Sequence, residues 1–243
     1  MRNIIALTGV SLLVAQSGYA FEFAGADFAG GYSAFFDQVN GETLSRTSGE
    51  ASLELTLGNR FGAQLDIGVQ KFEQISDDIE DNSISSTIHG LYYLNDATTL
   101  GAFYGKETLE KAEYLGVEAV YYGDRFDAEA YFGLGAVQDF DGSLEILGLR
   151  GAYGLGNSFD LIGSYSLAAF DDVVDLSLYE IGLEYKYSDH IRVSASYGRS
   201  NIAIENTETN VDDYFALEAE YSLGSARGAT FGERGVLNLI PGL

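Results

Sequence analysis

The stretch AEYLGVEAVYYGDRFDAEAYFGLGA, residues Ala112–Ala136, decides the fold class, because apolar and polar side chains alternate on both sides of a short turn. The apolar positions are Leu115, Val117, Ala119 and Tyr121 before the turn and Phe126, Ala128, Ala130, Phe132 and Leu134 after it. A period of two predicts strands, and the Gly-Asp-Arg between them predicts a hairpin. With Asp124-Arg125 as a two-residue loop, Tyr121 is expected opposite Ala128, and Glu118 opposite Tyr131.

This hairpin has one apolar face and one face that carries carboxylates, tyrosines and glycines. A soluble sandwich would bury the apolar face and leave the polar face in water. A barrel in lipid would turn the apolar face outward and line its lumen with the polar face. The hairpin alone fits both, so the rest of the chain has to decide.

The same pattern recurs along the chain and predicts twelve strands, at about 28–36, 49–57, 61–70, 84–94, 99–105, 112–122, 126–136, 143–153, 159–167, 177–186, 191–197 and 214–223. The first, fifth and eighth have the weakest patterns, so ten or fourteen strands are the alternatives. Short turns alternate with longer, mostly acidic connections: Asp37–Arg46, Lys71–Ser83, Lys106–Lys111, Gln138–Gly142, Ala168–Asp175 and Arg199–Asp213. This alternation is typical of a transmembrane barrel, whose even strand count puts both ends on the short-turn side.

Aromatic residues on the apolar face collect beside the short turns: Phe61, Tyr92, Tyr121, Phe126, Tyr153, Phe159, Tyr185 and Tyr221. An amphipathic ring suits the boundary between lipid and water, and membrane barrels carry girdles of such rings. In a soluble sandwich the aromatics would spread through the core. The sequence therefore predicts an all-β fold, an antiparallel up-and-down transmembrane β-barrel of about 12 strands.

Residues 1–20 are typical of a secretory signal peptide, with Arg2, the apolar run Ile4–Ala15 and the small-x-small site Gly18-Tyr19-Ala20. We therefore expect cleavage near Ala20, a barrel over residues 21–224 and a periplasmic C-terminal tail over residues 225–243. The chain has no cysteine, so neither disulfides nor a cysteine metal site is expected.

A cleavable signal, alternating strands, short turns and acidic long loops together make the chain resemble the Gram-negative outer-membrane porins of the small general-porin type. The resemblance covers Phe21–Gly224 and is one of pattern, without a short motif. It implies an outer-membrane location and passive diffusion of small hydrophilic solutes or ions. The chain departs from the family at its end: many members stop on a terminal Phe or Trp, whereas this one continues past Leu223 to Leu243.

The chain is strongly acidic, with 37 Asp and Glu against 13 Lys and Arg, for a formal net charge of −24. Such a charge argues against nucleic acid as a partner. The predicted pore-lining residues are Glu50, Glu54, Asp66, Glu118, Asp127, Glu129, Asp160, Glu180, Glu184, Arg192, Glu218 and Glu220. Carboxylates in a pore favour cations, so we expect a cation preference. The alternative is a non-conducting barrel that serves surface contact or envelope stability.

No enzymatic activity, catalytic residue or cofactor is expected. The chain has two histidines, of which His89 alternates inward in mid-strand and His190 lies in a short turn, and it contains no GxSxG. The acidic segments Asp77–Asn82, Asp171–Asp175 and Asp212-Asp213 could bind Ca²⁺ or Mg²⁺ that bridges lipopolysaccharide phosphates. The alternative is simple solvation, so no metal site is assigned. The expected partners are outer-membrane lipid, lipopolysaccharide and small solutes or cations; the oligomeric state stays open.

The tail contains Arg227, Arg234 and the short apolar run Val236–Ile240. One hypothesis is that it folds back into the periplasmic mouth, where its arginines meet inward carboxylates such as Glu218, Glu220 or Asp127. The alternative is a flexible periplasmic end, the usual fate of a terminus.

Overall fold

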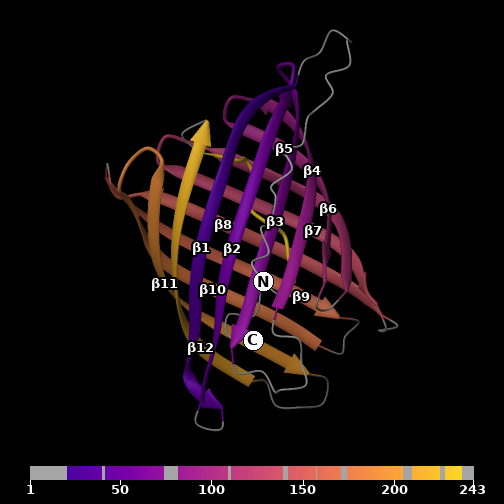
Figure 1. The fold of residues 1–243 in the computed structure, drawn as a ribbon, viewed down its shortest axis with the longest axis vertical. Coiled ribbons are helices and arrows are strands. Elements are labelled where there is room, and N and C mark those ends of the chain that lie inside the picture. Colours follow the sequence, from indigo (N-terminus) through magenta and orange to yellow (C-terminus); the bar gives the residue numbers. More distant parts are fainter. Residues whose placement is uncertain are drawn as a thin grey trace, which may run out of the picture.

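The computed structural model describes residues 21–39, 42–73, 82–108, 111–138, 142–156, 158–170, 174–204, 210–224 and 228–236. Within these ranges twelve antiparallel strands form a closed barrel, in which each strand pairs with its sequence neighbours and β1 closes the ring on β12 (Figure 1). The strands are β1 (Phe21–Val39), β2 (Glu42–Leu57), β3 (Phe61–Glu73), β4 (Asn82–Asn95), β5 (Thr98–Glu107), β6 (Ala112–Tyr122), β7 (Phe126–Val137), β8 (Ser143–Gly154), β9 (Phe159–Phe170), β10 (Val174–Lys186), β11 (Ile191–Ile204) and β12 (Asn210–Gly224). The predicted fold class and strand number are confirmed. The proposed signal peptide lies outside the described residues.

The β6–β7 hairpin has the predicted register. Tyr121 lies opposite Ala128, and Glu118 lies opposite Tyr131. Gly123 closes the hairpin by donating its backbone N–H to the carbonyl oxygen of Phe126 at 3.0 Å. The turn geometry and the alternation of the two strands therefore agree, which fixes the face of every side chain in the hairpin.

Several strands extend further toward the long-loop end than the sequence predicts. The segments Asp37–Arg46 and Arg199–Asp213 were expected to be loops, but β1, β2, β11 and β12 occupy most of both. These extensions lack the clear alternation of apolar and polar residues seen in the belt, so the sequence does not mark them as strands, although backbone pairing continues through them. Cross-strand ion pairs support this region, for example Arg199 Nε to Asp213 Oδ1 at 2.7 Å.

The outer face of the barrel is an apolar belt. Leu115, Val117 and Ile88 are 65%, 62% and 60% exposed. A monomer in water rarely exposes so much contiguous apolar surface. Lipid around the barrel removes the free-energy cost of exposing these side chains to water. The aromatics beside the short turns lie on this same face, as Phe61 and Tyr92 illustrate, with ring centres 5.5 Å apart. The described part of the chain contains no helix long and apolar enough to cross a membrane.

Apolar side chains also pack inside the barrel, which the sequence reading did not predict. Toward the long-loop end a buried cluster contains Phe35, Phe103, Ala112, Tyr114, Leu144, Ile146, Ala168, Leu176, Leu178, Tyr214 and Val236. Val236 belongs to the tail and is 1% exposed. The interior is thus polar along part of its length and packed with apolar groups near one end.

Candidate functional site

The structure places the twelve predicted lumen residues at inward positions of the strands, alternating with the outward apolar belt. Glu54, Asp66, Glu118 and Asp160 are buried at 4%, 1%, 5% and 5% exposure, and the other eight are partly buried. Arg150, whose face the sequence left open, lies opposite Glu129 and so faces inward too. That these residues line a conducting pore stays a prediction.

Tail residues 228–236 lie inside the ring of strands (Figure 1, bright yellow). Five of their backbone N–H groups donate to wall side chains: Ala229 to Asp27 at 2.6 Å, Thr230 to Glu54 at 2.7 Å, Phe231 to Gln64 at 3.0 Å, Gly232 to Glu129 at 3.3 Å and Val236 to Glu107 at 3.0 Å. These contacts fit the fold-back hypothesis for this part of the tail. The side of the membrane on which the rest of the tail lies stays a prediction.

The tail also accepts hydrogen bonds from the wall through its backbone carbonyls. Tyr122 donates its hydroxyl to the carbonyl of Thr230 at 2.7 Å, and Gln64 donates Nε2 to the carbonyl of Phe231 at 2.6 Å. Tyr114 donates to the carbonyl of Arg234 at 2.5 Å. Both sides of the tail backbone are therefore satisfied by wall side chains, as a buried polar backbone requires.

The tail follows the length of the barrel. Ala229 bonds Asp27, near the short-turn end of β1, whereas Val236 bonds Glu107, the last residue of β5 at the long-loop end. The segment thus runs from the short-turn part of the lumen toward its long-loop end.

Arg234 is the cation at the centre of the site. Its Nη2 lies 2.8 Å from Glu118 Oε2 and 2.5 Å from Glu129 Oε1, and its side chain is 3% exposed. The guanidinium carbon lies 4.2 Å from the ring centre of Tyr131, in cation–π geometry. Two carboxylates and one aromatic ring therefore surround a single buried guanidinium.

His89 joins this cluster from β4. Its Nε2 lies 2.8 Å from Asp66 Oδ2 and its Nδ1 lies 2.7 Å from Glu118 Oε1, so that a carboxylate faces each ring nitrogen. Phe231 of the tail stacks on the imidazole at 5.9 Å with an interplanar angle of 13°. A neutral imidazole donates from one nitrogen, and the protonated ring donates from both. The inward position that the sequence predicts for His89 agrees with its complete burial.

Three inward glycines make room for the tail. A Cβ at Gly25 would collide with the backbone oxygen of Gly228, and one at Gly68 would collide with Glu233. A Cβ at Gly101 would lie 2.7 Å from the ring of Phe231. The sequence contains these glycines, but a strand glycine by itself does not indicate what approaches it.

The predicted partners of the tail arginines were wrong in detail. Arg234 pairs with Glu118 and Glu129 instead of Glu218, Glu220 or Asp127, because the tail runs along β1–β7. Arg227 lies outside the described residues. On the opposite wall, Glu220 pairs with Arg192 and Asp160 pairs with Lys186.

The acidic loop segments give no metal centre within the described residues, where no group of three or more His, Cys, Asp or Glu could hold an ion. Asp77 and Asp171 lie outside the described ranges. Asp213 is described and forms an ion pair with Arg199. His190 lies in the β10–β11 turn, where its backbone N–H donates to the hydroxyl of Ser188 at 3.2 Å, as turn chemistry predicts.

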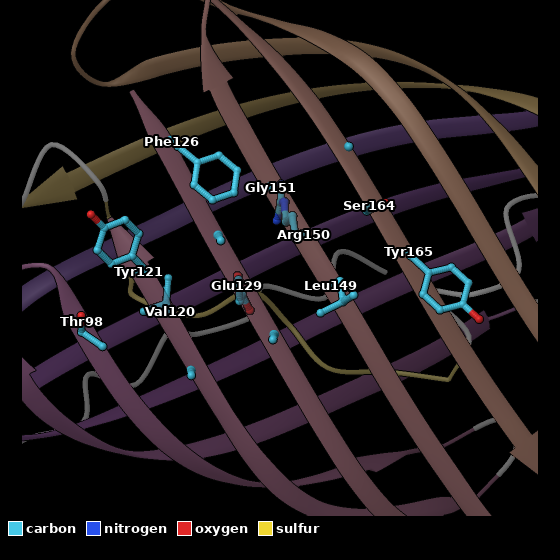
Figure 2. A pocket seen from close by; sticks show the side chains of 14 residues that line it. Thr98, Val120, Tyr121, Phe126, Glu129, Leu149, Arg150, Gly151, Ser164 and Tyr165 are labelled. Carbon is cyan, nitrogen blue, oxygen red and sulfur yellow. The ribbon is translucent and has the colours of Figure 1, made fainter. Parts of the chain in front are cut away.

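A depression of about 570 Å³ lies outside the lumen, on the wall formed by β6–β9. Figure 2 shows the rings of Tyr121, Phe126 and Tyr165 around it, while Glu129 and Arg150 project from the same strands toward the tail behind them. The small residues Ala128, Ala130, Gly151 and Gly163 also line it. It is therefore a thin, apolar part of the outer face and not a solute site of the lumen.

Comparison with known proteins adds evidence on the fold. No family model and no curated protein matches the chain. Solved structures do match. The NanC porin is 9% identical with a TM-score of 0.58, and the match covers 82% of this chain and 100% of that one. The KdgM porin in complex with disordered oligogalacturonate is 10% identical with a TM-score of 0.52, and the match covers 82% of this chain and 99% of that one. An outer membrane channel from Pseudomonas putida F1 matches at 13% identity and TM-score 0.55, covering 86% and 100%. The chain therefore has the fold of small outer-membrane porins.

Proposed function

We propose that the protein is an outer-membrane channel for passive diffusion of small hydrophilic solutes and ions, with a preference for cations. The observation that carries this proposal is the acidic inner face of a porin-like barrel. Glu184, Glu218 and Glu220 lie on it with partial exposure, and the arginines on this face include Arg46, Arg150 and Arg192. Carboxylates along a pore concentrate cations and repel anions.

The charge of the inner face bears on which solutes we propose for this barrel. The KdgM porin was solved with oligogalacturonate, a chain of sugar units that each carry a carboxylate. An acidic lumen would repel such a polyanion. We therefore propose cations and uncharged small solutes, rather than acidic oligosaccharides, for this barrel.

We infer that the route for solutes follows the wall of β8–β12. The tail hydrogen bonds described above go to side chains of β1–β7. Across the lumen, Glu184 and Glu218 are partly exposed and Arg150 is exposed. Charged side chains that water reaches are what a hydrated passage requires.

The geometry of His89 supports a non-enzymatic function. A histidine that activates a hydroxyl nucleophile needs one ring nitrogen free to accept its proton. Asp66 and Glu118 occupy both nitrogens of His89. The ring is thus engaged in holding the wall and the tail together.

A second candidate is the non-conducting barrel, favoured by the apolar cluster that Val236 joins near the long-loop end. Planar-bilayer recording separates the two candidates. We expect the full chain to give small, cation-selective unitary currents, and a variant that lacks residues 225–243 to give larger ones. Silence from both forms, when both are folded, would favour the non-conducting barrel. A reversal potential of anionic sign would contradict the charge argument.

A further inference from the structure

We propose that the inner wall formed by β1–β7 is a binding site for an arginine-bearing peptide, and that residues 228–236 are its resident occupant. The proposal does not require the barrel to conduct. It assigns peptides as the ligand class of the β1–β7 wall, in addition to any role of that wall in lining a pore.

Backbone recognition is the first support. Four consecutive tail residues, 229–232, each donate a backbone N–H to a wall side chain, and the acceptors come from β1, β2, β3 and β7. Gln64 bonds both the N–H and the C=O of Phe231. Such a pattern recognises the peptide backbone regardless of the side chains that the peptide carries.

Two side-chain pockets add selectivity. The guanidinium of Arg234 meets Glu118, Glu129 and the face of Tyr131. Three positions before Arg234, the ring of Phe231 packs with Leu91 and Val120 and stacks on His89. An aromatic residue followed three positions later by arginine is therefore the motif that this wall selects.

The wall is shaped for backbone contact. Gly25 faces the backbone of Gly228, and Gly101 faces the ring of Phe231, where a Cβ would meet ring carbon at 2.7 Å. Gly228 itself has φ +68° beside the carboxylate of Asp27, a conformation that suits glycine. Wall and tail are thus complementary at Gly228 and at Phe231.

Tethering explains why the site is occupied. The tail follows β12 directly, and a short tether gives its segment a local concentration of about millimolar. A free peptide competes poorly against that concentration while the tail is attached. Removing the tail should expose the site to a peptide of the same chemistry.

The test is a binding measurement on the detergent-folded barrel that lacks residues 225–243, with a fluorescent synthetic peptide of residues 225–243 as the probe. We expect saturable binding by fluorescence anisotropy, and at least about tenfold weaker binding of the R234Q peptide, equivalent to about 1.4 kcal/mol. The R234K peptide should lie between them, because lysine keeps the charge but loses the two-pronged contact. The full chain should bind the probe at least about tenfold more weakly than the truncated barrel.

The wall supplies matched controls. Glu118→Gln should weaken binding of the natural peptide, whereas Asp160→Asn, at an inward carboxylate that pairs with Lys186, should leave it unchanged. Absence of saturable binding, or equal binding of the R234Q peptide, overturns the proposal. If the truncated barrel fails to fold, a protease site at 225–227 lets the folded full chain be nicked. Retention of the nicked segment, with exchange for excess peptide, supports the site, and its loss without rebinding overturns it.

Discussion

Arg234 Nη2 lies 2.8 Å from Glu118 Oε2, although 116 residues separate the two in the sequence. Both side chains are almost completely buried, at 3% and 0% exposure. Glu118 also contacts Nδ1 of His89 at 2.7 Å. One carboxylate of the wall therefore connects the C-terminal segment to the charged cluster of β3, β4 and β6.

Substituting Arg234 tests how much this connection contributes to stability. Arg234→Gln leaves Glu118 and Glu129 without their cation, and losing one partner of a buried pair costs about 3–5 kcal/mol. We expect the free energy of unfolding to fall by about 3 kcal/mol. This is the lower end of the range, because departure of the tail would let water reach the two carboxylates. The measurement is denaturant unfolding from lipid vesicles.

The matched control is Arg199→Gln. Arg199 is 53% exposed and pairs with Asp213 on the outer rim, so its loss should cost far less stability than the loss of Arg234, because water screens an exposed pair. Adding Glu118→Gln to Arg234→Gln should recover part of the loss, since the two residues are in contact. Equal effects of the two arginine substitutions would contradict the buried-pair account.

A second prediction tests the steric fit without changing any charge. Gly25→Ala places a Cβ against the backbone oxygen of Gly228, so the tail should leave the lumen. Trypsin should then cut after Arg234, which is 2% exposed in the native structure, and mass spectrometry would detect the cut. Gly90→Ala is the control, because its nearest neighbour would lie 4.0 Å away. Resistance of the Gly25→Ala barrel to trypsin would show that the tail tolerates the added methyl.

The fold could be read from the sequence because its determinants are local. The alternation around Tyr121 and Ala128 and the short turn between them set register and faces together. The inward apolar residues Leu144 and Ile146 could not be read in this way, since both faces of β8 carry aliphatic side chains. For such a strand, periodicity leaves the inner face undefined.

The site was predictable in its composition but not in its pairings. Alternation put Glu118 and Glu129 inward, and net charge made a meeting with Arg234 reasonable. Which carboxylates it meets depends on the course of the tail, which follows the space left by Gly25 and Gly101. That space exists only in the closed barrel.

The lipid-facing belt offers a third prediction. The chain contains no tryptophan, so a single introduced indole reports its own depth. In vesicles with brominated lipids, Ile88→Trp should be quenched most by bromine deep in the acyl chains. Tyr121→Trp, at the aromatic girdle beside a short turn, should be quenched most by shallow bromine. Strong quenching of both by aqueous acrylamide would mean that this face meets water.

The last prediction concerns ion selectivity. Replacing Glu184 and Glu218 with Gln removes two partly exposed carboxylates from the wall that we propose carries the ions. A unit charge at about 4 Å in water contributes about 1 kcal/mol. Each substitution weakens the attraction of cations and the repulsion of anions alike, so it should lower the cation-to-anion permeability ratio by up to about thirtyfold. Reversal potentials across a KCl gradient measure this ratio.

Ionic strength provides the internal check on that selectivity. The screening length is about 10 Å at 0.1 M salt and about 3 Å at 1 M, so the difference between wild type and variant should shrink as KCl rises. Glu145→Gln is the matched control, because Glu145 lies opposite Leu134 and Ala169 on the outer side of β8 and is exposed. An equal shift with Glu145→Gln would assign the selectivity to overall surface charge. A difference that persists at 1 M would indicate a direct coordination site instead of a diffuse field.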